Sequence, residues 1–353
     1  MKLAVWILAF LTSSGAAHAQ FPSEGAPEIH FLTKAEAQQA IVDDSREPYF
    51  CELQPLEIVA KTGSPTSGAT LEEQREDCRQ RYKAAVMEFS PQEEIALSWY
   101  VKKLYPPLAQ HYPLFAAMPW SFIKVNPALE GGLPHTRGGN IVLSSHVLEA
   151  IVDFLSHEPG STSITTVSDL LIHEQTHVFQ RMHRQLFASL YHDFWGFQSV
   201  PPILPDPWLT KRHLTNPDAV ECNWIFPIPG KEPRWIWPLV ILGETNGIPR
   251  MPQDFRTVGV ELDKTDDGFM IRKSESGEPV VTELLSIPEY RRLFPDTMDI
   301  YHPNEASADL FAKIYMYDAW IPKKTLTPDE QAKWEQEYGP LRQWFQTHFQ
   351  NAP

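Results

Sequence analysis

The stretch SDLLIHEQTHVFQRMHRQLF, residues 168–187, places two histidines four residues apart, with a glutamate directly after the first. At 100° per residue, His173 and His177 lie roughly 40° apart on one face of a helix, so their imidazoles can converge on one ion. Glu174 projects to one side and can reach a metal-bound water without being a ligand itself. Apolar residues gather near the opposite side of this helix, at positions 164, 167, 171, 178, 182 and 186. The pattern predicts a helix anchored in a core, with both histidines facing a cleft.

This histidine pair suits the chemistry of a catalytic Zn²⁺ ion. Two neutral imidazoles and one further ligand leave a coordination position open for water. The ion lowers the pKa of that water towards ~7, and an adjacent carboxylate can accept the proton and deliver it to a leaving amine. Glu174 is the candidate general base. The alternative is a histidine pair that packs locally and binds no metal.

Residues 173–177, HEQTH, match the HExxH motif, and in this the chain resembles the zincin metallopeptidases. The preceding residues 138–154, GGNIVLSSHVLEAIVDF, are similar in placement to the edge strand and backing helix of those enzymes. The resemblance implies an α+β fold with a small mixed sheet and a peptide or protein substrate extended along the edge strand. Residues 139–143 would form that edge, and an ordinary buried strand is the alternative.

One candidate for the third ligand follows the metzincin pattern HExxHxxGxxH. His183 stands at the matching spacing, but Gln180 occupies the position of the glycine. That glycine lets the chain turn sharply, and in an unbroken helix His183 points roughly 100° away from the ligand pair. Met298 would be the candidate for the methionine turn of that group.

The preferred third ligand comes from residues 301–312, YHPNEASADLFA. Their NExxxD pattern resembles that of the thermolysin-type gluzincins. The resemblance implies that Glu305 binds zinc and that Asp309, one turn further along the helix, orients a ligand histidine. An exposed acid at a helix N-terminus, favoured by the helix dipole, is the other interpretation of Glu305. The match is confined to these two helical motifs and leaves the exact family unassigned.

Relatives of this kind polarise the scissile carbonyl with a tyrosine or histidine from a separate segment. The candidates are Tyr290, Tyr301, Tyr315, His213 and His302. Nothing in the sequence selects among them.

The N-terminal residues 1–20, MKLAVWILAFLTSSGAAHAQ, have the features of a secretory signal peptide. A basic Lys2 precedes a short apolar run and a small-x-small site, which predicts cleavage after Ala19 and a secreted or periplasmic protein. A short buried helix is the alternative. The apolar run is too short to cross a membrane, and no later segment reaches 18 uncharged apolar residues, so no membrane span is expected.

The sequence has 45 acidic and 30 basic residues and a formal net charge of −15. This excess of negative charge repels polyanions, so a nucleic-acid partner is not expected. Three cysteines, Cys51, Cys78 and Cys222, would reach an oxidising compartment. Cys51 and Cys78 are the natural disulfide pair because they are close in sequence, although other pairings stay open.

Local signals divide the chain after the signal peptide (1–19) into a helical N-terminal region, 20–115, and a zincin-like catalytic region, 116–353. Capping boxes at Thr33, Thr70 and Ser90 predict helices in the first region. In the second, Thr166 and Asp169 are placed to cap the histidine helix. We expect strands at 120–125, 138–144, 238–244, 256–263 and 268–274, closing helices at 303–320 and 328–338, and an irregular proline-rich stretch at 201–238.

These patterns together predict an exported zinc metallopeptidase in which His173, His177 and Glu305 hold the ion, Glu174 activates water and Asp309 supports a ligand. One alternative is a secreted binding or envelope-associated protein that keeps a zincin scaffold without turnover. Another is a zinc amidase or esterase that acts on a substrate other than a polypeptide.

Overall fold

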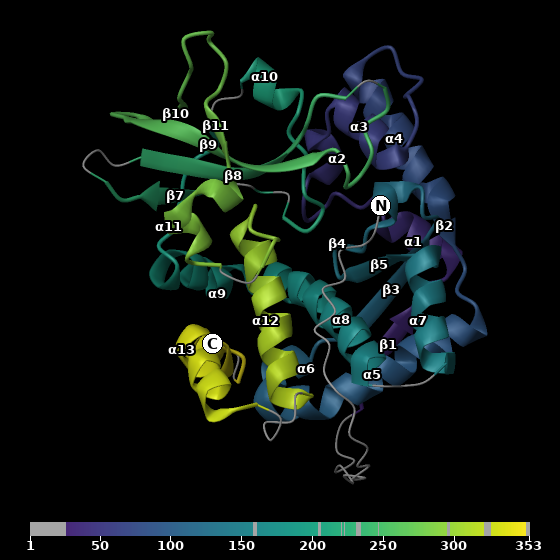
Figure 1. Ribbon diagram of the computed structural model, residues 1–353. Coiled ribbons are helices and arrows are strands. Elements are labelled where there is room, and N and C mark those ends of the chain that lie inside the picture. The colour runs from purple at the N-terminus through teal and green to yellow at the C-terminus, as the bar shows by residue number, and fades with distance from the viewer. Residues whose placement is uncertain are drawn as a thin grey trace.

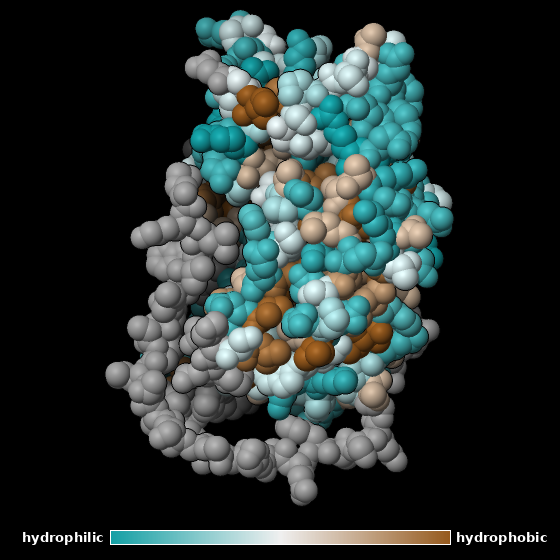
Figure 2. Space-filling model, turned by 90° about the vertical axis from the view of Figure 1, so that its right-hand side faces the viewer, coloured by the Kyte–Doolittle hydropathy of each residue, from teal (hydrophilic) through white to brown (hydrophobic). Residues whose placement is uncertain are grey.

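The computed structural model describes residues 26–157, 161–203, 206–219, 221, 223–230, 234–245, 247–294, 297–320 and 326–350 (Figure 1). These residues form helices and two sheets, which confirms the α+β class. The predicted signal peptide, residues 1–19, lies outside them. Within the described part of the chain, no helix combines the length and apolar character that crossing a membrane requires. The face drawn in Figure 2 is largely hydrophilic, with hydrophobic residues gathered mainly in its lower half.

Helices dominate the first part of the chain. The capping boxes at Thr33, Thr70 and Ser90 are confirmed, because each side chain accepts a hydrogen bond from the backbone N–H three residues on, and the glutamate there accepts one from the backbone N–H of the capping residue. These residues begin α1, α4 and α5. The helices of this part are α1 (Lys34–Ala40), α2 (Tyr49–Glu52), α3 (Pro55–Thr62), α4 (Leu71–Ala85), α5 (Pro91–His111) and α6 (Pro113–Ala116).

The first sheet is mixed and has the order β1-β3-β5-β4, with β2 paired to β3. Its strands are β1 (Ile29–Phe31), β2 (Val86–Met87), β3 (Trp120–Val125), β4 (His135–Arg137) and β5 (Asn140–Ser144). β3 runs parallel to β1 and β5, whereas β4 is antiparallel to β5. Since β1 and β2 precede residue 116, the predicted N-terminal region, 20–115, shares this sheet with the residues that follow it.

The prediction that residues 139–143 form the edge strand of this sheet is wrong. Residues 140–143 belong to β5, which has β3 on one side and β4 on the other. Gly138 takes a left-handed φ of 58° and closes a tight hairpin, which places a further strand, β4, outside β5. The edge of the sheet is therefore formed by His135–Arg137.

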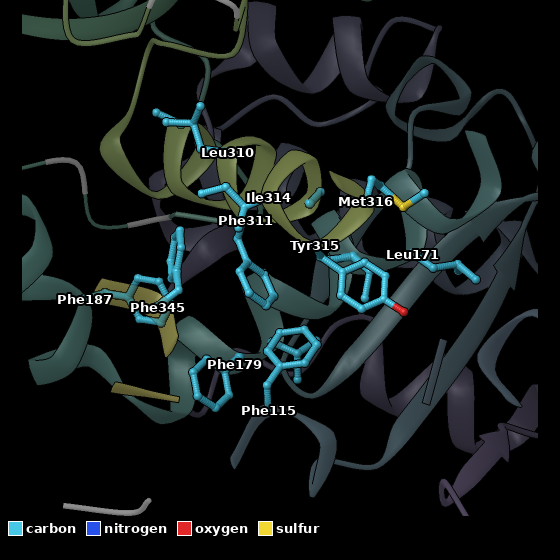
Figure 3. Close-up of a cluster of buried hydrophobic side chains, with 14 of the residues drawn as sticks. Phe115, Leu171, Phe179, Phe187, Leu310, Phe311, Ile314, Tyr315, Met316 and Phe345 are labelled. Carbon is cyan, nitrogen blue, oxygen red and sulfur yellow. The ribbon is translucent and has the colours of Figure 1, made fainter. Parts of the chain in front are cut away.

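Two helices cross the middle of the molecule side by side, α8 (Ser161–Met182) and α12 (Pro303–Ala319) (Figure 1). α8 begins earlier than expected, so Thr166 and Asp169 lie inside the helix and do not cap it. Aromatic side chains pack against the two helices, and Phe115 of α6 contacts both Phe179 of α8 and Phe311 of α12 (Figure 3). This core fixes α8 against α12. The neighbouring helices are α7 (Ser145–His157), α9 (Arg184–Ser189), α11 (Pro288–Arg291) and α13 (Pro328–His348).

The second sheet is antiparallel, with the order β10-β9-β8-β7-β6 and β11 paired to β9. Its strands are β6 (Gln198–Ser199), β7 (Trp224–Ile228), β8 (Arg234–Leu242), β9 (Phe255–Thr265), β10 (Gly268–Ile271) and β11 (Val281–Glu283). The stretch 201–238 predicted to be irregular therefore contains β7 and the start of β8. The pairing of β8 with β7 stops at Ile236, so at Pro238 the strand pairs with β9 alone. Proline is tolerated there because its missing N–H is not needed for a second neighbouring strand.

Four short elements complete the described chain: α10 (Pro207–Thr210), the 3₁₀ turns η1 (Leu129–Gly132) and η3 (Leu284–Ser286), and the π-helical turn η2 (Leu190–Phe194).

Cys51 and Cys78 are free in the structure, so the expected disulfide between them is not formed. Cys78 on α4 points into a core cluster with Phe50, while Cys51 on α2 is exposed near Arg79, 3.8 Å from its Nη2 to Sγ. Phe50 and Cys51 are successive residues of α2 and face different ways. Because Phe50 faces the core, Cys51 faces solvent, away from the buried thiol of Cys78. Cys222 lies outside the described residues.

We expect Cys51 to react with a thiol reagent such as Ellman's reagent in the native protein and Cys78 to react only after unfolding. Burial excludes the reagent from Cys78 and raises the pKa of its thiol, which leaves little reactive thiolate. The number of fast-reacting thiols should fall by one in Cys51→Ser and stay unchanged in Cys78→Ser. If neither thiol reacts until a reductant is added, the two cysteines are bridged after all.

Candidate metal centre

The structure brings His173, His177 and Glu305 together at the crossing of α8 and α12. Their ligand atoms all lie within 4.8 Å of one another. The two Nε2 atoms are 3.0 Å apart, and Oε2 of Glu305 is 3.4 Å from each of them. A residue of α12 thus meets one turn of α8 despite the long stretch of chain between them.

These distances fit a tetrahedral zinc site. Zinc bonds of about 2.0–2.1 Å at tetrahedral angles place neighbouring ligand atoms about 3.3 Å apart. The observed separations of 3.0 and 3.4 Å lie on either side of that value. The side chains of His177 and Glu305 are buried, whereas that of His173 is 18% exposed. The fourth position of such an ion would therefore open beside His173.

Glu305 is oriented by a loop that lies between α10 and β7 in the chain. Asn216 donates from Nδ2 to Oε1 of Glu305 over 2.5 Å, which leaves Oε2 directed at the imidazoles. Glu305 also lies in the first turn of α12, where the helix dipole favours a negative charge. Burial opposes ionisation, but His177 and His173 hold the pKa of Glu305 well below its usual value. The group is therefore a carboxylate, as a metal ligand must be.

Asn216 belongs to a loop, residues 214–219, that the N-terminal region holds in place. The neighbouring Thr215 donates its backbone N–H to Glu57 over 2.5 Å, and its carbonyl accepts from Nζ of Lys61 over 3.0 Å. Both side chains come from α3 and are buried. The helical N-terminal region thus supports the Asn216 contact to Glu305.

Glu174 lies beside the three ligands without belonging to them. It is 4% exposed, and its Oε2 is buried with no hydrogen-bond partner among the described residues. Burial, reinforced by the charge of Asp218, raises the pKa of Glu174 to about 8 against the opposing effect of His173 and His177. A dication at the site would favour the ionised form again. Such a carboxylate can take a proton from a water molecule next to the ligands.

His177 has a partner that the sequence did not identify as functional. Its Nδ1 lies 2.9 Å from Oε1 of Gln180, and the amide nitrogen of Gln180 donates to the carbonyl of Asn304 and to the hydroxyl of Ser307. Gln180 had stood out only as the residue in place of the metzincin glycine. An amide three residues after a ligand histidine on the same helix was the available signal.

His183 and Met298, the residues of the metzincin interpretation, lie elsewhere. α8 ends at Met182, and the His183 ring packs on Phe179 with 4.3 Å between ring centroids. Met298 is 58% exposed. Neither belongs to the group that could hold an ion, so the geometry favours Glu305 as the third ligand.

Asp309 does not make the contact expected of it. Its Oδ2 pairs with Nζ of Lys313 at 3.1 Å, four residues along α12, and no hydrogen bond to His173 or His177 occurs among the described contacts. Burial, together with the nearby charge of Asp309, raises the pKa of Asp169 to about 6. It therefore belongs to the acidic surroundings of His173 and not to its direct partners.

Of the five candidates for polarising a carbonyl, four have other structural roles. Tyr290 and Tyr315 are buried and donate to backbone carbonyls, His302 caps α12, and His213 is half-buried beside a tryptophan ring. Tyr301 instead lines a cavity of about 90 Å³ next to the loop 214–219. Burial and the nearby Glu305 raise the pKa of Tyr301, which keeps its hydroxyl protonated and able to donate.

The outer edge of β4 is covered by the same loop. Asp218 accepts from the backbone N–H of Thr136 at 2.7 Å, and Arg181 reaches the carbonyls of Thr136 and Pro217 at 3.5 and 2.5 Å. A substrate strand could pair with β4 only if this loop moved, because these side chains occupy the edge.

Comparison with protein-family models, with characterised proteins and with solved structures gives no match. The resemblance to zincins therefore depends on the two motifs and on the geometry of these side chains.

Proposed function

We propose that this chain is an exported zinc metallopeptidase in which His173, His177 and Glu305 hold the ion. The observation that carries the proposal is the approach of Glu305 to both imidazoles at tetrahedral spacing. Export depends on the predicted signal peptide, residues 1–19, and the free thiols add no support to it. A peptide or protein is the proposed substrate.

The side chains divide the chemistry among them. Zinc, when bound, would supply the Lewis acidity that makes water a nucleophile near neutral pH. Glu174 accepts the proton of that water and later passes it to the leaving amine. Tyr301 is the candidate for donating to the carbonyl oxygen, because it lies near Glu305 and lines the cavity beside the loop 214–219. Burial of His177, Glu174 and Glu305 excludes competing solvent.

One observation favours a second candidate, a zinc amidase or esterase acting on a compact substrate. The edge of β4, where an extended peptide would pair, is occupied by Asp218 and Arg181. A small amide or ester would need only the opening beside His173. The intact Glu174 weighs against a scaffold that merely binds a partner.

We expect the mature chain to contain one zinc per molecule and to lose hydrolysis when treated with 1,10-phenanthroline. Zinc should restore cleavage of a peptide library, because no residue of the site can replace the Lewis acid. Elemental analysis and mass spectrometry of the cleaved library measure the two quantities. Zinc without peptide cleavage, but with hydrolysis of small esters or amides, would select the second candidate. A protein that binds no zinc would contradict both.

A further inference from the structure

Gln180 forms a bridge between the two helices of the metal centre. It follows His177 by three residues on α8 and is 7% exposed. Its Oε1 lies 2.9 Å from Nδ1 of His177, while Nε2 donates to the Asn304 carbonyl at 2.8 Å and to Oγ of Ser307 at 2.9 Å. Both acceptors are on α12, on either side of Glu305 in sequence. All the polar atoms of this amide are thus engaged.

The partners on α12 determine which way the amide faces. A reversed amide would place its oxygen against the carbonyl oxygen of Asn304, where two acceptors repel each other. The oxygen of Gln180 therefore faces His177, and Nδ1 must carry the proton that it accepts. In the neutral imidazole that would bind an ion, the lone pair of His177 is then on Nε2, the atom that lies 3.0 Å from Nε2 of His173.

We propose that Gln180 is a positioning residue of the metal centre, which holds the His177 imidazole in the tautomer and orientation that present Nε2 to the ion. The proposal rests on the proposed zinc site. Outer partners of this kind fix a ligand ring and raise its basicity, and their loss typically weakens metal binding 10–100-fold. A glycine at position 180 would lack any side chain to do this.

Two substitutions separate the acceptor of Gln180 from the rest of its side chain. Gln180→Met keeps the length but removes the acceptor and both donors. Gln180→Glu keeps an acceptor for His177, and burial beside the Asn304 carbonyl favours its protonated form, whose hydroxyl donates to that carbonyl as the amide does. We expect zinc affinity, measured by competition with a chelator, to fall 10–100-fold in the methionine variant and to stay close to wild type in the glutamate variant.

Gln175 provides a matched control on the same helix. It is fully buried, and its Nε2 donates to the Pro119 carbonyl at 3.0 Å, away from the ligands. Gln175→Met should leave zinc affinity unchanged. The visible absorption of the cobalt-substituted protein should shift in Gln180→Met alone, since that spectrum reports the ligand field and not overall stability.

Several results would overturn the assignment. Wild-type zinc affinity in Gln180→Met would show that the His177 ring needs no such partner. An equal loss in Gln175→Met, or in Gln180→Glu, would show that the effect comes from helix packing and not from the acceptor. A wild-type chain that bound no zinc would overturn the proposed function and this assignment with it, whereas zinc binding unaffected by Gln180→Met overturns the assignment alone.

Discussion

Replacing Glu174 with glutamine should lower kcat/KM by about 10²–10⁴-fold while zinc remains bound. The amide has nearly the same shape as the carboxyl group but cannot accept a proton from water. Glu174 is suited to that step because it is buried beside the ligands and its Oε2 has no partner among the described residues. Zinc content should persist because Glu174 is not one of the three groups that converge.

The measurement combines steady-state kinetics on a cleaved library peptide with elemental analysis of the same preparation. Glu149→Gln, which changes an exposed acid on α7, serves as the control and should keep full activity. Turnover of the Glu174 variant within tenfold of wild type would rule out a general base at this position. Loss of zinc from that variant would mean that Glu174 is a ligand.

Local sequence signals were sufficient for the parts of the site that lie within one helix. The spacing of His173 and His177 places both on one face of α8, and the start of α12 at Pro303 places Glu305 in its first turn. Capping boxes marked the N-terminal helices for the same reason, since a cap involves residues only three apart. Such features need no knowledge of distant segments.

Features that depend on tertiary contacts escaped prediction. Asn216 reaches Glu305 from a loop, and Gln180 owes its role to α12, which lies far along the chain. The edge position of β4 follows from strand pairing, which a short run of apolar residues does not specify. Asp309 is different, because its partner Lys313 lies four residues along the same helix, a pairing that the sequence itself contains.

Replacing Glu305 with alanine should reduce zinc affinity by more than ~100-fold, which is a larger loss than the removal of an outer partner such as Gln180 causes. Two imidazoles would remain, and the charge that balances the dication would be lost. The pKa of Glu305 lies well below its usual value, so the wild-type side chain carries that charge throughout the neutral range. Chelator competition measures the affinity, and thermal unfolding of the metal-free proteins checks that the variant still folds.

His183→Ala is the decisive comparison for Glu305→Ala, because the two residues are the rival third ligands. His183 packs on Phe179 where α8 ends, so its removal should cost packing but leave zinc bound. If zinc affinity is lost in His183→Ala and kept in Glu305→Ala, the assignment is reversed and the metzincin interpretation is restored. Affinity kept in both variants would place the ion, if one binds, outside this crossing of helices. Oε2 of Glu305 lies 3.4 Å from Nε2 of each imidazole. This distance predicts that zinc affinity falls in Glu305→Ala and not in His183→Ala.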